Sequence, residues 1–407
     1  MSTDQKMSAL EDVWLQVFTL LLIVSGVFSL HYMLRPAPAL PQPALQVPVQ
    51  PARARGGPIT EALAAPERQT APAAAAQLPE AAAEKPAAPR TPGRWVVGRD
   101  GGPGVNSTSL GDAAARAVDG DSIVLRPGTY EVSVLTSKSL TISGGGRSPE
   151  EVVLTNSLNP TFAIGGGRMV MENLTISNTS QVDYWALSVS RAVLLLRSVN
   201  VKSSGKGVRV QGADLEASDC EFEASAGMSV SGKSKVKLSG VSVVGSVVGI
   251  TVQDSSADLQ LDGSHISGGG AGLRVSDGAW ARVGGTTISG NRYAGIMVAS
   301  GAEVRVSRSQ LTGNGECGAY IEENGKLVLE NVTLTRNKCG VGFAGAGTLE
   351  VHGSKFAANS MGAIAVSPLQ GEKALITGGG NSGLLVPGEK RPAAKKRAAA
   401  QEEESEE

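Results

Sequence analysis

Apolar and polar residues alternate in short stretches that recur along the C-terminal two thirds of the chain. A glycine followed by apolar, variable and apolar residues returns at spacings of 20, 22, 23, 23, 23 and 22 residues, at Gly207, Gly227, Gly249, Gly272, Gly295, Gly318 and Gly340. Each repeat holds a second alternating stretch, such as Val304-Arg305-Val306, and a third around Ile266 or its counterparts. Three short strands per repeat of about 22 residues, separated by Gly, Asn and Ser turns, predict one coil of a three-sided parallel β-helix.

The predicted domain is all-β, spans residues 94–388 and contains about eleven coils. Each coil adds about 4.8 Å, which gives a rod roughly 50 Å long. Four asparagines, Asn291, Asn314, Asn337 and Asn359, recur at spacings of 23, 23 and 22 residues, just before a new coil. Asparagine tolerates a left-handed backbone and its amides can hydrogen-bond when stacked, so these positions predict an asparagine ladder.

The alternation also predicts columns of outward side chains along the coils. On the first strand the column is Arg209, Ser229, Thr251, Arg274, Met297, Tyr320 and Gly342. On the second strand the columns are Asp214, Lys235, Asp258, Trp280, Glu303, Lys326 and Thr348, beside Glu216, Lys237, Gln260, Arg282, Arg305, Val328 and Glu350. On the third strand the column is Glu221, Ser242, His265, Thr287, Gln310, Thr333 and Lys355.

The two ends of a parallel stack expose strand edges, which invite aggregation unless they are covered. Residues 109–118 predict a covering helix for the N-terminal end. Ser109 offers an N-cap, and Leu110, Ala113, Ala114 and Val118 form one apolar face.

A family resemblance follows from residues 119–130 (DGDSIVLRPGTY) and 139–144 (SLTISG). These runs resemble the opening of the pectin-lyase-like superfamily of right-handed β-helices, especially its bacterial β-helix-repeat proteins. The resemblance covers residues 94–383 and implies a right-handed helix. It says little about activity, because that superfamily includes lyases, hydrolases, esterases and non-catalytic binders.

The N-terminal third of the chain has a different character. Residues 13–34 contain no Asp, Glu, Lys or Arg and are long enough for a transmembrane helix, preceded by a tail at residues 1–12. A cleaved secretory signal is the alternative. Residues 35–93 hold 13 of the 20 prolines and predict a disordered Pro/Ala linker. Residues 389–407 are a basic cluster followed by glutamates, typical of a solvated disordered tail.

These segments predict a single-pass protein of the cell (inner) membrane. The positive-inside rule barely decides its orientation, because Lys6 and Arg35 flank the segment. By analogy with exported β-helices on single anchors, we expect the β-helix on the periplasmic or extracellular side. Residues 7–18 faintly resemble the start of ExbD/MotB-type helices. That resemblance implies a proton-linked role for Asp12 and an accessory subunit of a proton-driven membrane complex.

The composition argues against a nucleic-acid partner and against a helix-rich fold. Lys and Arg number 37 against 38 Asp and Glu, so no broad basic field predicts a nucleic-acid partner. Aromatics make up 4% and glycine numbers 52, which argues against an ordinary helix-rich globule.

Candidate catalytic chemistry is weak. Asp214 and Glu216 face the same way, but Lys235 and Lys237 lie one coil away, so an ion-pair ladder explains all four. No column gathers three carboxylates, so we predict no metal site, cofactor or catalytic residue. The motifs of the polygalacturonase-like hydrolases are absent too. A polysaccharide-active lyase or hydrolase with an unrecognised site remains the alternative.

Binding has more support in the sequence. Trp280, Arg282, Arg305 and Tyr320 are predicted to point outward, and sugar rings stack on exposed aromatic faces. The expected partner is a polysaccharide or an envelope protein, bound without catalysis. The competing interpretation packs the aromatic rings under turns.

The three cysteines are too few for a disulfide-built scaffold. Cys317 and Cys339 occupy the same column of adjacent coils, within disulfide range. Either a bridge or a reduced pair fits that spacing. Cys220 is expected to point into the core.

Overall fold

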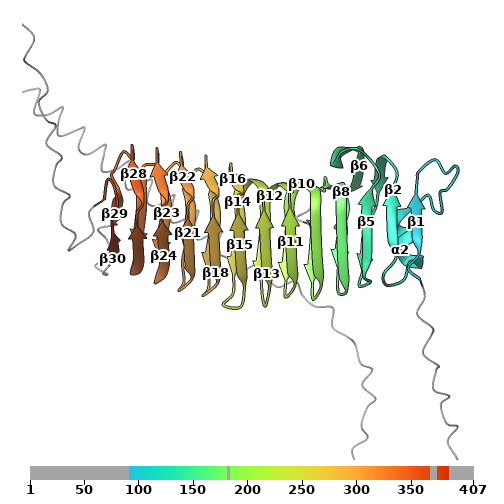
Figure 1. Ribbon diagram of the computed structural model, residues 1–407, viewed down its shortest axis with the longest axis horizontal. Helices are drawn as coiled ribbons and strands as arrows, with labels where there is room; N and C mark the ends of the chain where they lie inside the picture. Colours follow the sequence, from blue (N-terminus) through green and yellow to red (C-terminus); the bar gives the residue numbers. More distant parts are fainter. Residues whose placement is uncertain (1–90, 181–183, 367–373, 385–407) are drawn as a thin grey trace, which may run out of the picture. The chain divides into compact units, whose positions relative to one another are not determined.

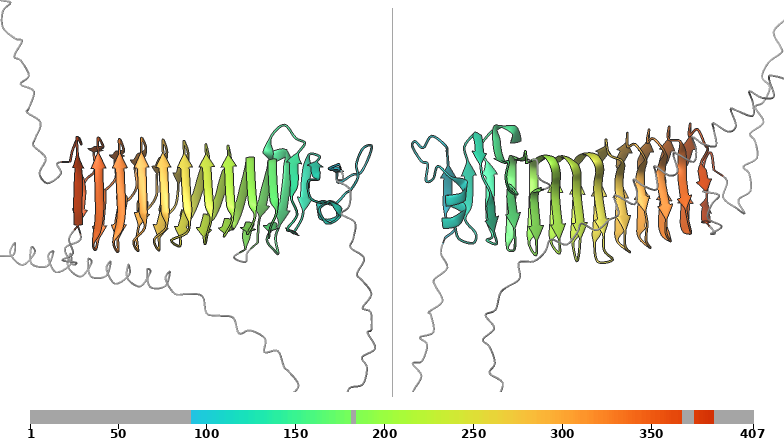
Figure 2. Two further views of the ribbon diagram at one scale, coloured as in Figure 1. Left: turned by 60° about the horizontal axis from the view of Figure 1, so that its bottom comes forward. Right: turned by 180° about the vertical axis from the view of Figure 1, so that it is seen from behind.

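The computed structural model describes residues 91–180, 184–366 and 374–384 of the chain. Within them the chain winds through three sheets, and each strand pairs in parallel with the strands one coil before and after it. The coils stack in chain order along one axis (Figure 1), and two further views show the same succession of coils (Figure 2). The predicted parallel β-helix of about eleven coils is confirmed.

Four long strands turn corners and contribute to more than one sheet. They are β8 (Arg168–Asn178), β10 (Val193–Gln211), β12 (Glu221–Ser231) and β14 (Ser242–Gln253).

The first sheet contains the last parts of β10, β12 and β14. Its other strands are β4 (Val134–Thr136), β7 (Phe162–Ile164), β9 (Trp185–Ser190), β17 (Ala271–Ser276), β20 (Ala294–Val298), β23 (Cys317–Glu322), β26 (Cys339–Ala344) and β29 (Ile364–Val366).

The second sheet contains the first parts of β8 and β10. Its other strands are β1 (Arg94–Val97), β2 (Ser122–Leu125), β5 (Leu140–Gly144), β11 (Asp214–Ser218), β13 (Lys235–Ser239), β15 (Asp258–Asp262), β18 (Trp280–Gly284), β21 (Glu303–Ser307), β24 (Gly325–Glu330), β27 (Gly347–His352) and β30 (Ala374–Gly379).

The third sheet contains the remaining parts of the long strands. Its other strands are β3 (Gly128–Glu131), β6 (Val152–Asn156), β16 (His265–Ser267), β19 (Thr287–Ser289), β22 (Gln310–Thr312), β25 (Thr333–Thr335) and β28 (Lys355–Ala357). A short 3₁₀ helix, η1 (Pro149–Glu151), precedes β6.

The core is a continuous column of aliphatic side chains between the three sheets. Alternate residues of each strand point inward and stack on the same position of the next coil, as Ile250, Leu273 and Ile296 do, all fully buried. Burying one such side chain stabilises the fold by roughly 1.5–3 kcal/mol. The other residues of each strand form the four predicted outward columns, whose registers are confirmed.

The asparagine ladder is confirmed at one corner of the stack. Nδ2 of Asn291 donates to Oδ1 of Asn314 at 2.9 Å, and Nδ2 of Asn314 donates to Oδ1 of Asn337 at 3.1 Å. Asn337 continues to Asn359 at 3.3 Å. The first three are buried, so the ladder satisfies backbone and side-chain groups that water does not reach.

A second ladder of hydroxyl groups runs along the corner that precedes the third sheet. Oγ of Ser264 accepts the backbone N–H of Val241, and Oγ1 of Thr286 accepts that of Ser264. Oγ of Ser309 then accepts the N–H of Thr286. The serine or threonine directly before β16, β19 and β22 therefore accepts a backbone hydrogen bond from the preceding coil.

The N-terminal end is covered by helix α2 (Leu110–Arg116), as predicted. Ser109 caps it by accepting the N–H of Asp112 at 3.2 Å, and Leu110, Ala113 and Ala114 are buried. Val118 was expected on the same apolar face, which is wrong. The helix ends at Arg116, and Val118 is 40% exposed.

The carboxylate of Asp121 links β1 and the residues after α2 to the first coil. It is fully buried and accepts N–H groups from Gly93 at 2.6 Å, the indole of Trp95 at 3.1 Å and Val118 at 3.0 Å. Lys138 Nζ donates to the carbonyl of Ala117 and to two others at the C-terminal end of α2. The helix is therefore held onto the first coils by specific polar contacts in addition to its apolar face.

Within residues 91–180, 184–366 and 374–384, no helix is long and apolar enough to span a membrane. The predicted membrane segment, nearly all of the linker and the charged tail lie outside these residues, as does Asp12. Their roles stay predictions.

Candidate functional site

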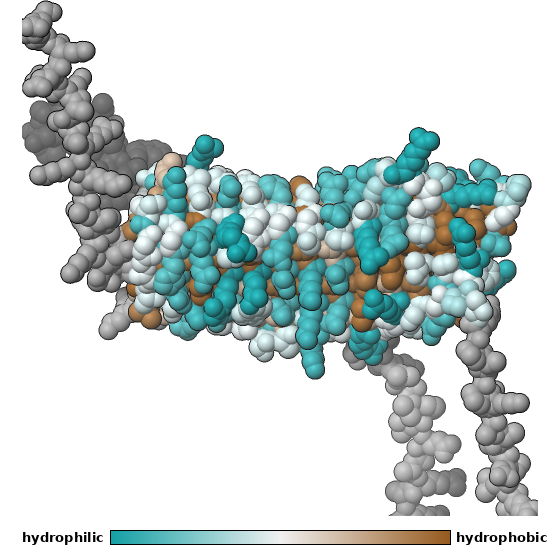
Figure 3. All heavy atoms as spheres, viewed as in Figure 1, coloured by the Kyte–Doolittle hydropathy of each residue, from teal (hydrophilic) through white to brown (hydrophobic). Residues whose placement is uncertain are grey.

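The outer face of the second sheet brings together three of the four predicted binding residues. Trp280 and Arg282 lie on β18, and Arg305 lies on β21, where its register partner is Arg282. The strand alternation directs all three side chains outward. Polar and charged side chains dominate the surface in the view of Figure 3.

Trp280 and Arg282 form a stacked pair. The guanidinium carbon of Arg282 lies 5.0 Å from the centroid of the Trp280 ring, within the range of a cation–π interaction. Trp280 is half-buried and Arg282 is exposed. Trp280 is the first residue of β18 and follows directly on the turn at Asp277 and Gly278.

Arg305 is held by a small ion-pair group. Its Nη2 lies 2.7 Å from Oε1 of Glu303, and Nζ of Lys326 lies 3.5 Å from the same oxygen. Glu303 thus serves two cations on neighbouring coils. No carboxylate within 4.0 Å pairs with Arg282 among the described residues, although like charges directly opposite on adjacent strands repel. Arg282 is therefore the arginine of this pair that has no carboxylate partner among the described residues, whereas Arg305 is paired with Glu303.

In the described chain, a carboxylate oxygen without a hydrogen-bond partner lies in the same column as Trp280, one coil earlier. Asp258 is the register partner of Trp280, and its buried Oδ1 has no hydrogen-bond partner within the described part of the chain. Leaving such an atom unpaired costs about 1–3 kcal/mol or more, which is a common feature of functional positions.

Tyr320 does not join this group. It lies on β23 of the first sheet, and its ring covers Gly342, where an added Cβ would come 2.5 Å from the ring. Partial burial, with Glu322 and Glu316 nearby, raises the pKa of Tyr320. The sequence columns had already placed Tyr320 on the first strand of its coil and the other three residues on the second, and the register agrees.

Three cysteines are placed as their columns suggested. Cys317 and Cys339 are register partners with Cα atoms 4.5 Å apart, and their sulfur atoms are bonded. Cys220 is buried and unbonded. Burial raises the pKa of its thiol to about 11.

The proposed ladder of Asp214, Glu216, Lys235 and Lys237 has the predicted register. In the described chain no ion pair within 4.0 Å joins these four side chains. Exposed side chains of this length keep their rotamer freedom, and one weak ion pair does not offset its loss.

Two polar features escaped the sequence interpretation. Lys206 Nζ lies 5.6 Å from the ring of Trp185, one coil before it on the first sheet. A pocket of about 220 Å³ lies along the corner beside Lys202, which is 3.8 Å from Glu223. Spacings of one coil could have indicated both pairs.

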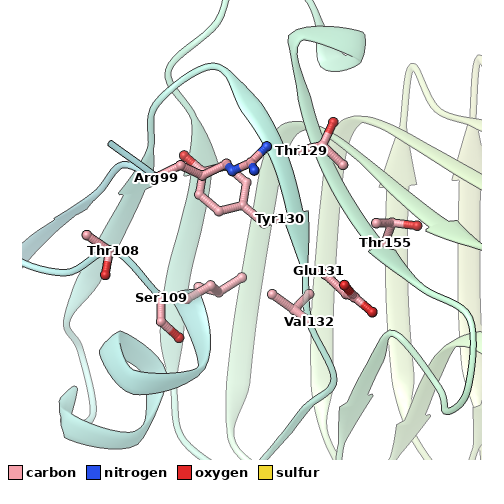
Figure 4. A pocket seen from close by; sticks show the side chains of 9 residues that line it. Arg99, Thr108, Ser109, Thr129, Tyr130, Glu131, Val132 and Thr155 are labelled. Carbon is pink, nitrogen blue, oxygen red and sulfur yellow. The ribbon is translucent and has the colours of Figure 1, made fainter. Parts of the chain in front are cut away.

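A larger pocket of about 410 Å³ lies beside the N-terminal cap. Figure 4 shows Arg99 next to the ring of Tyr130, with Glu131 and Thr155 on neighbouring strands. The hydroxyl of Tyr130 donates to the carbonyl of Arg126 at 2.7 Å, and burial raises its pKa. The non-repeating loop before α2 forms one wall, so no periodicity indicated this pocket.

Within the described residues, no group of three or more His, Cys, Asp or Glu side chains could hold a metal ion. His265 is exposed, and His352 lies 3.2 Å from Glu350 on the same strand.

Comparisons with known proteins agree with this architecture. Residues 226–383 match a family model described as a right handed beta helix region. The chain is a right-handed parallel β-helix protein. No curated protein gives a significant match.

Solved structures similar to this β-helix protein are distant. DFA-IIIase from Arthrobacter chlorophenolicus matches with 12% identity and a TM-score of 0.48, covering 70% of this chain and 93% of its own. The A-module of mannuronan C-5 epimerase AlgE6 from Azotobacter vinelandii matches with 13% identity and a TM-score of 0.42, covering 67% and 92%. Pectin methylesterase PemA from Erwinia chrysanthemi matches with 10% identity and a TM-score of 0.36, covering 56% and 80%. Likeness this low says nothing about a shared activity.

Proposed function

We propose that the β-helix is a non-catalytic binding module for an acidic polysaccharide. The observation that supports it is the group on the second sheet, where the Arg282 guanidinium lies over the Trp280 ring and Arg305 is the register partner of Arg282 on the next coil. An aromatic ring provides an apolar platform for a sugar ring. Guanidinium groups bind carboxylates through paired N–H donors.

The spacing of the group favours an extended chain over a small ligand. Arg282 and Arg305 are one coil apart, which is about 4.8 Å, and the face continues to Lys326 on the next coil. A polymer lying along the coils would contact these groups in succession.

Membrane attachment through residues 13–34 is the second part of the proposal. The disulfide between Cys317 and Cys339 supports an extracytoplasmic place for the β-helix, because disulfides persist in oxidising compartments. Carbonate extraction of membranes and a topology reporter fused after residue 407 would test it. A protein released by carbonate, or a reporter facing the cytoplasm, would contradict it.

The binding test uses the full chain in detergent with soluble polygalacturonate, alginate and neutral dextran as probes. We expect binding to the two polyuronates that weakens with salt. Trp280→Ala and Arg282→Ala should each reduce affinity about tenfold, which corresponds to about 1.4 kcal/mol. Trp185→Ala is the matched control, because it removes a second tryptophan with a cation above its ring from another sheet.

Two results would refute this function. Equal loss of binding in Trp185→Ala would show that the second sheet has no special role. Release of unsaturated sugars or new reducing ends from either polyuronate would show that the protein is an enzyme.

A further inference from the structure

The C-terminal end of the rod differs from the N-terminal end in how its strand edges are covered. Helix α2 covers the N-terminal end, and its Leu110 is fully buried there. At the other end β29 pairs only with β26, and β30 pairs only with β27, among the described strands. Each therefore presents one edge of N–H and C=O groups for which no described strand is a partner.

The two described segments of the last coil carry no charge, and Pro368, Glu372 and Lys373 lie between them in the sequence. Residues 356–366 (FAANSMGAIAV) and 374–384 (ALITGGGNSGL) contain no Asp, Glu, Lys, Arg or Pro. Edge strands are usually protected from pairing by lysine, proline or bulges. Such protection is missing from these two segments.

Three of the eight large apolar side chains that are exposed in the described chain lie at this end, and three others lie in the N-terminal coils. Met361 is 59% exposed, Val366 is 53% exposed and Leu375 is 56% exposed. Ile364 and Ile376 pack against the core on one side and are only partly buried. Where it is visible, this end of the rod shows hydrophobic atoms in Figure 3. Strands paired onto this edge would bury the apolar surface that these side chains leave exposed.

Two other segments of the chain are poorly suited to supply a further strand for this edge. Residues 385–407 contain eleven charged residues and two prolines, and their only large apolar residues are Leu385 and Val386. The 13 prolines between residues 35 and 93 break that segment into short runs, and proline cannot donate to a ladder. Neither segment has the alternating apolar pattern of another coil.

We infer that the C-terminal edge binds the same edge of a second copy of this chain. Strand edges are self-complementary, and a two-fold axis across the rod would place β29 of each copy along β30 of the other in an antiparallel sense. The N-terminal edge is less available to a second copy, because Asn106 and Ser107 hydrogen-bond along β1 at Val96 and Gly98 and α2 packs its apolar face onto the core there. The contact therefore closes as a tail-to-tail dimer and does not grow into a fibre.

The test begins with the mass of the full chain in detergent, measured by light scattering across a concentration series. We expect a dimer. The variant Leu375→Lys/Thr377→Lys places two cations on the outer face of β30, at positions that are already exposed, and should raise the dissociation constant about tenfold or more. The control Leu135→Lys/Leu158→Lys replaces side chains that are 82% and 73% exposed in the N-terminal coils, and it should dimerise normally.

Distances between copies separate this contact from association through the N-terminal segment. Spin labels at Leu375→Cys should lie close together, within about 20 Å, whereas labels at Leu135→Cys should be roughly 100 Å apart, twice the length of the rod. A monomeric wild-type chain would overturn the inference. So would a dimer that keeps its affinity in the edge variant, or one with a short distance between the Leu135→Cys labels.

Discussion

Replacing Asn314 with alanine should destabilise the centre of the asparagine ladder. Oδ1 of Asn314 accepts the backbone N–H of Asn291 at 3.2 Å and its side-chain amide at 2.9 Å. Nδ2 of Asn314 donates to Oδ1 of Asn337 at 3.1 Å and to the carbonyl of Ile288 at 3.3 Å. Asn314 is 2% exposed, so water does not replace these four bonds without opening the corner.

The expected cost follows from the groups that lose their partners. Oδ1 of Asn337 keeps the backbone N–H of residue 314, and the amide of Asn291 keeps the carbonyl of Ser289. The N–H of Asn291 and the carbonyl of Ile288 lose the side-chain partners described above. At about 1–3 kcal/mol for each buried orphan, the free energy of unfolding should fall by about 3 kcal/mol.

Hydrogen exchange is the suitable assay, because neighbouring coils of a solenoid can open locally. Protection should drop in peptides covering residues 288–320 and remain unchanged near residues 122–156. The control Gln310→Ala removes an exposed amide from the same coil and should cost at most about 0.5 kcal/mol. A loss below about 1 kcal/mol for Asn314→Ala, or equal effects of the two variants, would refute the structural role of the ladder.

Three further outcomes are expected. Asp121→Ala should cost about 3 kcal/mol by removing the acceptor of three N–H groups, and exchange should rise in the first coils while the last coils stay protected. Reducing the disulfide between Cys317 and Cys339, or replacing both with serine, should lower stability by about 3 kcal/mol in urea titrations, since it closes a loop of about 22 residues. An unchanged urea midpoint would contradict that role. Cys220 should resist alkylation at pH 8 in the folded protein, because burial raises its pKa to about 11, and should react once urea unfolds the chain; labelling of the folded chain, seen by mass spectrometry, would show that the core opens there.

Repetition explains why so much of the fold could be predicted from the sequence. In a coil of about 22 residues, one alternation of apolar and polar residues assigns each side chain to the inside or the outside. Stacking then places residues one repeat apart next to each other, and this predicted the Cys317–Cys339 juxtaposition and the ladder through Asn314. Both depend only on chain distance, because neighbouring coils are the nearest contacts in a solenoid.

The candidate site depended on information that the repeat lacks. The sequence columns predicted that Trp280, Arg282 and Arg305 share one face and that Tyr320 lies on another, and the structure agrees. It also decided that Arg282 stacks on Trp280 and that Asp258 keeps an unpaired oxygen. Rotamers and local packing determine such contacts, and a pattern of polar positions does not encode them.

The sequence by itself determined the coil repeat and which side chains face inward, because alternation and repeat length are local properties of the chain, whereas the long strands β8, β10, β12 and β14 were not predicted. Only the tertiary structure showed which contacts hold the covering helix in place and which strand edges have no partner among the described strands. The sequence predicted the covering helix at residues 109–118, yet Asp121 became its anchor only when Gly93, Trp95 and Val118 converged on one carboxylate. The edge of β29 and β30 could likewise be recognised only in the structure, because it depends on no described strand pairing on their outer side.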